Sequence, residues 1–101
     1  MVFLYVTCRN LDEAKAVSRA LIERKAAGWV NISPVQAVYR SGDGVKEVDG
    51  AAIIIKTIES KVQNVEDTVR EFHRGRISCI ASFSLYRLNR EYKDGLINTV
   101  A

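Results

Sequence analysis

The side chains in this sequence with the strongest metal-binding chemistry are two cysteines and the only histidine: Cys8, Cys79 and His73. Thiolate and imidazole are the ligands that copper and zinc prefer. No close spacing such as Cys-x-x-Cys joins the three residues, so a shared site would depend on the fold. The alternative is structural: a small core side chain at Cys79, a strand end at Cys8, and a cation at a helix C-terminus at His73.

Composition limits the class of protein. The chain has 101 residues, of which 48% are hydrophobic, so we expect a single domain over residues 1–101. Its net charge of +3 comes from 15 basic and 12 acidic residues that are spread along the chain, which indicates neither a nucleic-acid nor a membrane partner. No apolar run reaches the roughly 20 residues of a membrane-spanning helix, and no signal peptide is recognisable. We expect a cytoplasmic protein with two reduced cysteines.

The first 28 residues predict a strand followed by a helix. Residues Val2–Thr7 are mostly β-branched or aromatic, and they predict a strand with both faces buried. Asn10 supplies a helix N-cap, with Glu13 three residues further on. The apolar spacing that follows predicts a helix to about Ala26, with Gly28 just past its end.

The middle of the chain predicts a β-hairpin. Residues 29–39 are extended in character, and Pro34 lacks an amide donor, which is typical of an edge strand or a bulge. The Ser-Gly-Asp-Gly sequence at 41–44 favours a tight turn into a third strand over residues 45–57. Gly50 is a candidate β-bulge in that strand.

The last third of the chain predicts a helix, a strand and a final helix. Ser60 and Gln63 form a capping box for a helix that should end at Arg74, capped by the following glycine. Side chains alternate over residues 77–85, which predicts a fourth strand with one core face. A short helix should begin at Asn89.

This order, βαββαβ with an extra C-terminal helix, predicts an α+β ferredoxin-like sandwich with an antiparallel sheet ordered 4-1-3-2 and two helices on one face. In that topology, the end of the first strand, the start of the fourth and the end of the second helix meet at one edge. Cys8, Cys79 and His73 should therefore converge there. The opposite sheet face is apolar too, as Ile53–Ile55 illustrate, so we expect another copy of the chain to cover it.

A series of short motifs spans the chain from about Leu4 to Val100. They are Val6-Thr7-Cys8, Ala26-Ala27, Ile32 beside Pro34, Tyr39, Ile55-Lys56-Thr57, His73 and Tyr92. In this order and spacing they resemble the CutA family of divalent-ion tolerance proteins, which are small cytoplasmic ferredoxin-like homotrimers. The resemblance implies a homotrimer that takes part in copper tolerance and binds a divalent cation or a small ligand at the clefts between its subunits.

The chain also departs from the family pattern. The family has a cysteine where this chain has Gly28, a tryptophan where it has Ser41, and a His-Pro-Tyr-x-x-Pro-Glu run of which only His73 remains. Most groups that would hold a cation in the family are therefore replaced. Cys8, His73 and Cys79 are the metal ligands that we expect here, with copper or zinc as the ion.

Other residues are candidates for different contacts. Arg9 lies just before a helix N-terminus, where free amides attract anions, and it is with Lys56 a weaker candidate for binding an anionic ligand. Acylphosphatases use the same loop in this fold, but their glycine-rich signature is absent, which favours an ordinary capped helix. Trp29 and Tyr39 flank the second strand and are expected to pack at a subunit interface.

Two other classes of function are considered. RNA-recognition modules share this strand order, and four arginines form a basic rim: Arg74, Arg76, Arg87 and Arg90. The third strand lacks the exposed aromatic residues of those modules, so no nucleic-acid partner is expected. No recognisable catalytic motif is present, so no enzymatic activity is expected. The alternative function is a regulatory module that binds a metabolite or a partner protein, as in the fold-related PII and ACT families.

Overall fold

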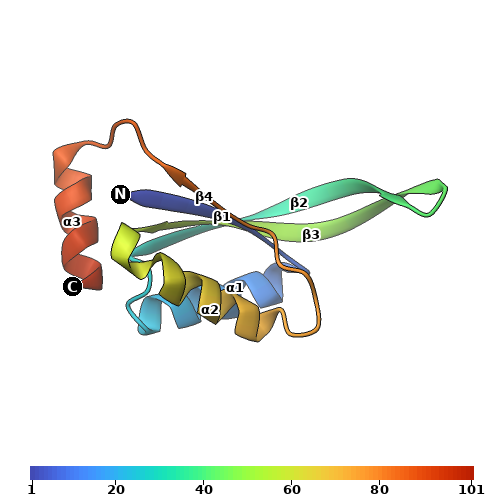
Figure 1. Ribbon diagram of the computed structural model, residues 1–101, viewed down its shortest axis with the longest axis horizontal. Coiled ribbons are helices and arrows are strands. Elements are labelled where there is room, and N and C mark those ends of the chain that lie inside the picture. Colours follow the sequence, from blue (N-terminus) through green and yellow to red (C-terminus); the bar gives the residue numbers. More distant parts are fainter.

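The computed structural model describes residues 1–101, and the order of its elements is the predicted one (Figure 1). The strands are β1 (Val2–Cys8), β2 (Trp29–Ser41), β3 (Gly44–Thr57) and β4 (Ile80–Ser84). The helices are α1 (Leu11–Glu23), α2 (Val62–Phe72) and α3 (Arg90–Val100), and a 3-10 turn, η1 (Glu59–Lys61), precedes α2.

The four strands form one antiparallel sheet in the order β2-β3-β1-β4, which is the predicted order read from the other edge. Helices α1 and α2 cover one face of this sheet, and α3 stands at the end where the N-terminus lies (Figure 1). The α+β ferredoxin-like fold is therefore confirmed.

The core lies between the sheet and the two long helices. Alternate residues of β1 and β3 point toward the helices, because side chains alternate between the faces of a strand. Residues at helical spacing on α1 and α2 meet them, so each helix has one apolar stripe. The residues with no exposed surface in this layer are Leu4, Val6, Ala14, Val17, Leu21, Ala51, Ile53, Ile55, Val65 and Val69.

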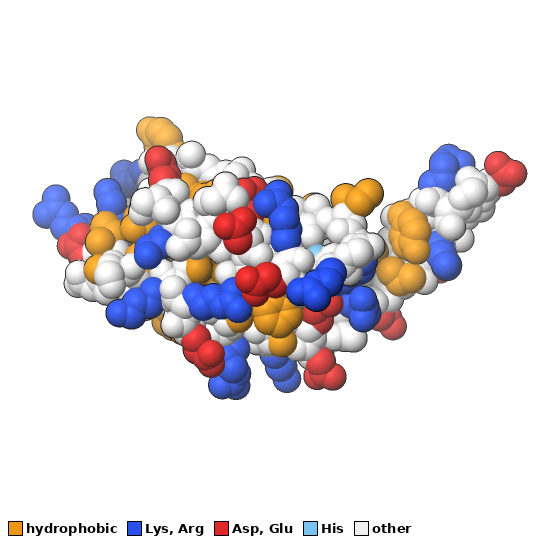
Figure 2. Space-filling model, turned by 60° about the horizontal axis from the view of Figure 1, so that its bottom comes forward, with side chains coloured by type: hydrophobic (Ala, Val, Ile, Leu, Met, Phe, Trp, Pro, Cys, Tyr) orange, Lys and Arg blue, Asp and Glu red, His pale blue; other side chains and the backbone are white.

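Strands β2 and β3 extend beyond the sheet as a two-stranded arm. They pair without interruption from Trp29–Lys56 to Ser41–Gly44, whereas β1 pairs only with residues 51–57 of β3. Figure 1 shows the arm projecting from the body, and Figure 2 shows hydrophobic side chains along it and charged ones at its tip. Gly42, in the turn at the tip, has a φ of 61°, a conformation that glycine adopts without strain.

The predicted bulge at Gly50 is wrong. The residue pairs directly with Val35, and the pairing on either side keeps the same register. A glycine is present at position 50 for another reason than a bulge. A Cβ atom there would lie only 3.1 Å from the carbonyl oxygen of Cys8. The glycine therefore allows β3 to pass close to the end of β1.

Helix α1 is shorter than predicted, since it ends at Glu23 and not at Ala26. A Schellman motif closes it: the N–H of Ala26 donates to the carbonyl of Leu21 at 2.9 Å, and Lys25 adopts a positive φ of 57°. This turn directs Ala26 and the next alanine into the core, where they are 0% and 1% exposed. Helical periodicity did not reveal the turn, because a lysine and not a glycine takes the left-handed conformation.

The predicted capping box of the second helix is also wrong. Ser60 lies within η1, and no side chain caps the start of α2 at Lys61. The side chain of Gln63 instead donates to Asp67 Oδ1 at 2.9 Å, one helical turn further on. The apolar spacing located this helix correctly, while its polar start signal was misleading.

The end of α2 and the start of β4 differ from the prediction. Helix α2 ends at Phe72 with His73 as its C-cap, two residues before the predicted end at Arg74. Residues 77–79 lie outside the strand, and Ile77 is fully exposed. Because β4 begins at Ile80 opposite Val6, its even-numbered residues share the face that carries the core. The odd-numbered apolar residues lie on the other face.

That other face of the sheet, the back face, is apolar and only partly covered within one chain. Tyr5, Ile54 and Phe83 lie there and are 37%, 38% and 45% exposed. The rings of Phe3 and Phe83 make an edge-to-face contact with centroids 6.4 Å apart. The expectation that both faces of the first strand are buried therefore holds within a single chain only for the helix-covered face.

Helix α3 packs beside the chain segment that enters β2. Leu96 and Val100 are buried, and a Cβ atom built on Gly28 would lie only 2.4 Å from Leu96 Cδ1. The prediction that Gly28 caps α1 is therefore wrong. The glycine instead lets α3 approach closely. A Cβ atom on Gly95, in the same helix, would meet nothing within 4 Å.

Replacement of these two glycines by alanine should have opposite effects. We expect Gly28→Ala to lower the free energy of unfolding by about 1–2 kcal/mol, because Leu96 must move in a packed contact. Gly95→Ala should raise it by up to about 1 kcal/mol, because alanine favours an exposed helical position. Denaturant unfolding of both variants measures the difference, and equal effects would contradict the proposed close packing of α3.

Candidate cation site

Cys8, Glu13 and His73 bring a sulfur, a carboxylate oxygen and an imidazole nitrogen within 4.8 Å of one another. Cys8 is the last residue of β1, Glu13 lies in the first turn of α1, and His73 caps the C-terminus of α2. These three ends meet at the end of the sheet opposite α3 (Figure 1). Cys8 and His73 are 7% and 4% exposed, so the group is largely shielded from water.

Local structure fixes Glu13 next to the strand end. The side chain of Asn10 accepts a hydrogen bond from the N–H of Glu13 at 2.8 Å, and Glu13 Oε1 accepts one from the N–H of Arg9 at 2.8 Å. This is a capping box displaced by one residue, since the returning bond normally comes from the cap residue itself. The sequence predicted the cap, but it did not predict that the carboxylate also faces Cys8 and His73.

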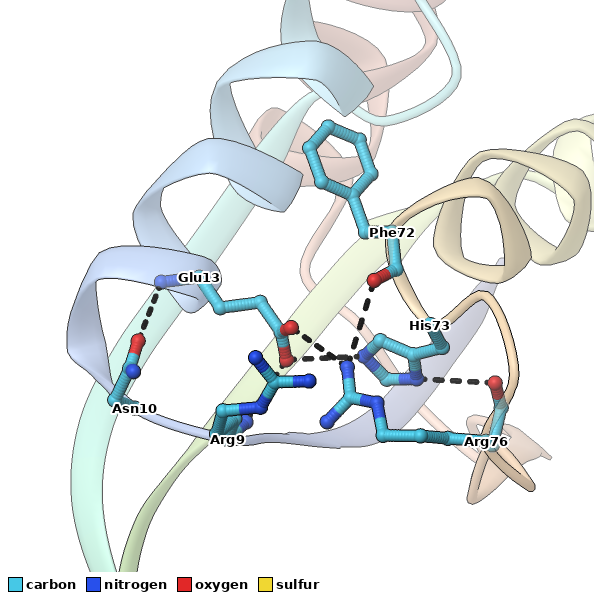
Figure 3. Close-up of polar contacts among 7 residues, drawn as sticks. Arg9, Asn10, Glu13, Phe72, His73 and Arg76 are labelled. Atoms are coloured by element: carbon cyan, nitrogen blue, oxygen red, sulfur yellow. Dashed lines mark hydrogen bonds and ion pairs between the residues drawn. The ribbon is translucent and has the colours of Figure 1, made fainter.

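Glu13 is the centre of the polar contacts in Figure 3. Its Oε2 pairs with Arg76 Nη2 at 2.6 Å, and its Oε1 lies 3.4 Å from His73 Nε2. Burial raises the pKa of this carboxyl, but the hydrogen bonds from Arg76 and from the Arg9 amide outweigh burial, and the net result is a lowered pKa. Glu13 is therefore ionised at neutral pH.

His73 is held in its neutral form. Burial lowers its pKa, the positive charges of Arg76 and Arg9 lower it further, and the Glu13 carboxylate only partly opposes them. The interpretation of His73 as a cation at a helix C-terminus is thus not supported by its surroundings. Its Nδ1 lies 3.0 Å from Ser78 Oγ, whereas its Nε2 is buried and has no hydrogen-bond partner.

Cys8 is held in its thiol form. Burial raises its pKa from the ordinary value of 9.0 to about 11, with a further contribution from the negative charge of Glu13, while Arg76 acts in the opposite direction. A cation that binds the sulfur must therefore displace its proton.

The three groups fit a borderline divalent cation. If Nδ1 of neutral His73 donates its proton to Ser78, the lone pair on Nε2 faces the Glu13 carboxylate with no proton between the two acceptors. A bound cation would satisfy both atoms, together with the sulfur of Cys8. Zinc bonds of about 2.0–2.3 Å place tetrahedral ligands about 3.3–3.8 Å apart, so the 4.8 Å group needs to contract by only about 1 Å.

The other predicted site residues lie elsewhere. Cys79 is exposed, just before β4, and does not belong to the group, in which Glu13 takes its place. Arg9 is exposed beside Glu13, and its backbone N–H, not its charge, makes the contact. Trp29 and Tyr39 are 52% and 45% exposed along β2.

Lys56 lies on the back face near α3, far along β3 from the Cys8 end. Its ammonium donates to Tyr92 Oη at 3.3 Å and lies 5.2–5.9 Å from the ring centroids of Phe3, Trp29 and Tyr92. Cation–π contacts of this kind hold the side chain in place. A hollow of about 240 Å³, lined by Trp29 and Tyr92 among others, opens beside it.

Comparisons with known proteins agree with this fold. The sequence model of the CutA1 divalent ion tolerance protein matches residues 2–98. A divalent-cation tolerance protein CutA of Archaeoglobus fulgidus is 31% identical over 98 residues, which is 97% of this chain and 96% of the relative.

Solved structures give the same result. The structure of a periplasmic divalent cation tolerance protein CutA from Archaeoglobus fulgidus superposes with a TM-score of 0.92 at 30% identity and covers 100% of both chains. The divalent ion tolerance protein CutA1 of Ehrlichia chaffeensis superposes with a TM-score of 0.94 at 25% identity over 99% of this chain and 94% of its own. The chain belongs to the CutA1 family of divalent-ion tolerance proteins. None of its helices is long and apolar enough to span a bilayer.

The site predicts how stability depends on pH. Glu13 and His73 have lowered pKa values in the folded chain, so the unfolded chain binds more protons at acidic pH, and stability should fall as the pH drops below about 6.5. The raised pKa of Cys8 acts in the other direction, and stability should fall as the pH rises from 9.0 toward about 11. The free energy of unfolding should therefore be highest between about pH 7 and pH 9.

Urea unfolding across this range tests the assignment. Cys8→Ala should remove much of the alkaline loss, which for a buried thiol with this pKa is about 2 kcal/mol. Cys79→Ala, at the exposed thiol, is the matched control and should leave the alkaline loss unchanged. An alkaline loss that persists in Cys8→Ala would show that another group is responsible.

Proposed function

We propose that this chain is a homotrimeric, non-enzymatic protein that binds a divalent cation, copper or zinc, and serves in metal tolerance. The ligands are Cys8 Sγ, a Glu13 carboxylate oxygen and His73 Nε2, and a fourth position stays open for water or a small ligand. The membership of the CutA1 family supports the link to divalent ions. The cytoplasm is the proposed location, in keeping with two free thiols.

The buried Nε2 of His73 is the observation that carries the cation site. A buried nitrogen with no partner loses its interaction with water and gains nothing in return, so such atoms are rare in stable proteins. Ser78, on the opposite side of the ring, is placed to accept the Nδ1 proton, and in that tautomer the lone pair on Nε2 is free for a cation. A cation between Nε2, Oε1 and Sγ would remove the deficit.

Arg76 and the cation can occupy the site together. Arg76 contacts Oε2 of Glu13, whereas His73 faces Oε1, so the two oxygens serve different partners. A thiolate and a carboxylate supply two negative charges, which match the charge of a divalent ion. Arg76 also lowers the pKa of Cys8, and it thereby favours the thiolate that the cation needs.

The apolar back face supports the proposed trimer. Tyr5, Ile54 and Phe83 form a continuous surface on neighbouring strands, and exposed patches of this kind are covered in most stable proteins. Trp29 and Tyr39 lie on the same face of β2, and Tyr39 extends the apolar surface along the arm. Three copies packed through this face would bury it, and Lys56 would then lie near a cleft between subunits, where its ammonium could bind a small anionic ligand.

Metal titration tests the cation site. We expect zinc binding to weaken by at least about tenfold in Cys8→Ser and in His73→Asn, because each loses a ligand. Cys79→Ser is the matched thiol control and should bind within about twofold of the parent. If zinc binding weakens equally in the two cysteine variants, Cys79 is also a ligand. If it weakens in neither, no cysteine sulfur binds the cation.

The pH dependence of binding provides a second test of the same ligands. Because the thiol proton of Cys8 must leave, zinc affinity should rise about tenfold per pH unit between about pH 7 and pH 9. Calorimetry in buffers of different ionisation enthalpy counts the released protons. A slope that stays the same in Cys8→Ser would contradict coordination by this sulfur.

Two isoleucines of similar exposure test the trimer. The parent protein should have a light-scattering mass three times that of its 11.3 kDa chain. Ile54→Glu, on the back face, should yield monomers, whereas Ile22→Glu, on α1 at 41% exposure, should stay trimeric. A monomeric parent, or a trimer that persists in Ile54→Glu, would show that the back face is not the interface.

A further inference from the structure

A basic hollow lies on the outer side of the turn that joins α2 to β4. It has a volume of about 410 Å³ and is lined by residues of the segment 70–78, among them Arg70, Arg74, Arg76 and Ser78. Gly75, at the centre of the turn, has a φ of 79°, which allows the chain to reverse tightly between the second and third of these arginines. Three arginines therefore line one hollow.

Two of these three arginines have no negative partner. The ion pairs of the chain join Arg24 to Glu71 and Arg76 to Glu13, and Arg70 and Arg74 pair with no carboxylate. Arg70 lies in the last turn of α2 and Arg74 just past its end, and like charges that line one hollow repel one another. An anion in the hollow would relieve this repulsion and satisfy several guanidinium donors at once.

The lining favours a phosphate group over other anions. Planar guanidinium groups bind phosphate oxygens through paired hydrogen bonds, and Ser78 adds a hydroxyl group to the lining of the same hollow. Ile77 is the only hydrophobic residue in the lining, so the hollow offers no aromatic surface on which a nucleic-acid base could stack. The volume exceeds that of a phosphate ion and leaves room for the small molecule that carries it.

We propose that the hollow lined by Arg70, Arg74, Arg76 and Ser78 is a binding site for phosphate or a small phosphate monoester. The hollow adjoins the proposed cation site, because His73 and Arg76 both border it and Arg76 is also tied to Glu13. It does not require a bound metal, so either proposal can fail without the other.

Charge-matched double variants test this proposal. Calorimetric titration with inorganic phosphate and with glycerol 3-phosphate, at about 150 mM salt to screen distant charges, should show saturable binding to the parent. Arg70→Gln/Arg74→Gln should weaken it by about tenfold or more. Arg87→Gln/Arg90→Gln removes the same charge from exposed arginines outside the hollow and should bind within about twofold of the parent.

The outcomes separate the alternatives. Tighter binding of the ester than of free phosphate would identify a phosphorylated metabolite, and equal binding would identify phosphate itself; both support the site. Equal weakening in the two double variants, or no saturation in the parent, would overturn it. Stronger binding of a single-stranded RNA, lost in both double variants, would also overturn it, because it would assign the basic rim to nucleic acid. Should the first pair not fold, Arg74→Gln alone provides the same comparison.

Discussion

The carboxylate of Glu13 is the interaction on which the geometry of the site depends. It accepts the N–H of Arg9 at the end of β1, pairs with Arg76 in the turn after α2, and faces the ring of His73 at the end of that helix. One nearly buried side chain thus joins three segments that are distant in sequence. Because it stays ionised, it sets the charge states around it: it helps to raise the pKa of Cys8, and it partly offsets the burial that keeps His73 neutral.

The two faces of the sheet have different roles. The helix-covered face holds the core and, at one end, the proposed ligands, which are positioned by element ends and not by loops. The back face carries aromatic and aliphatic side chains that a single chain leaves partly exposed, and it continues onto the arm of β2 and β3. If the chain functions as proposed, this arrangement would place cation binding within one chain and assembly on the opposite side, so that loss of the trimer would leave the three ligands together.

The sequence predicted the fold well because strands, helices and the hairpin are encoded locally by periodicity and by residues such as Asn10 and Gly42. Prediction from the sequence failed where a contact with a residue distant in the chain determines which residue fits. Gly28 and Gly50 are small because Leu96 and the Cys8 carbonyl pass close to them, and no local pattern reveals either neighbour. Of the site, the meeting of Cys8 with His73 was predictable from topology. The role of Glu13 in the site was not predictable, because its position near the helix N-cap already accounted for the residue. Its partner Arg76 lies 63 residues away in the sequence.

The central claim is that one sulfur, from Cys8, binds the cation together with Glu13 and His73. X-ray absorption spectroscopy of the zinc-loaded protein tests it most directly, because the method counts sulfur ligands. We predict one sulfur at about 2.3 Å and two or three nitrogen or oxygen ligands at about 2.0 Å. Two sulfur ligands, or none, would contradict the account.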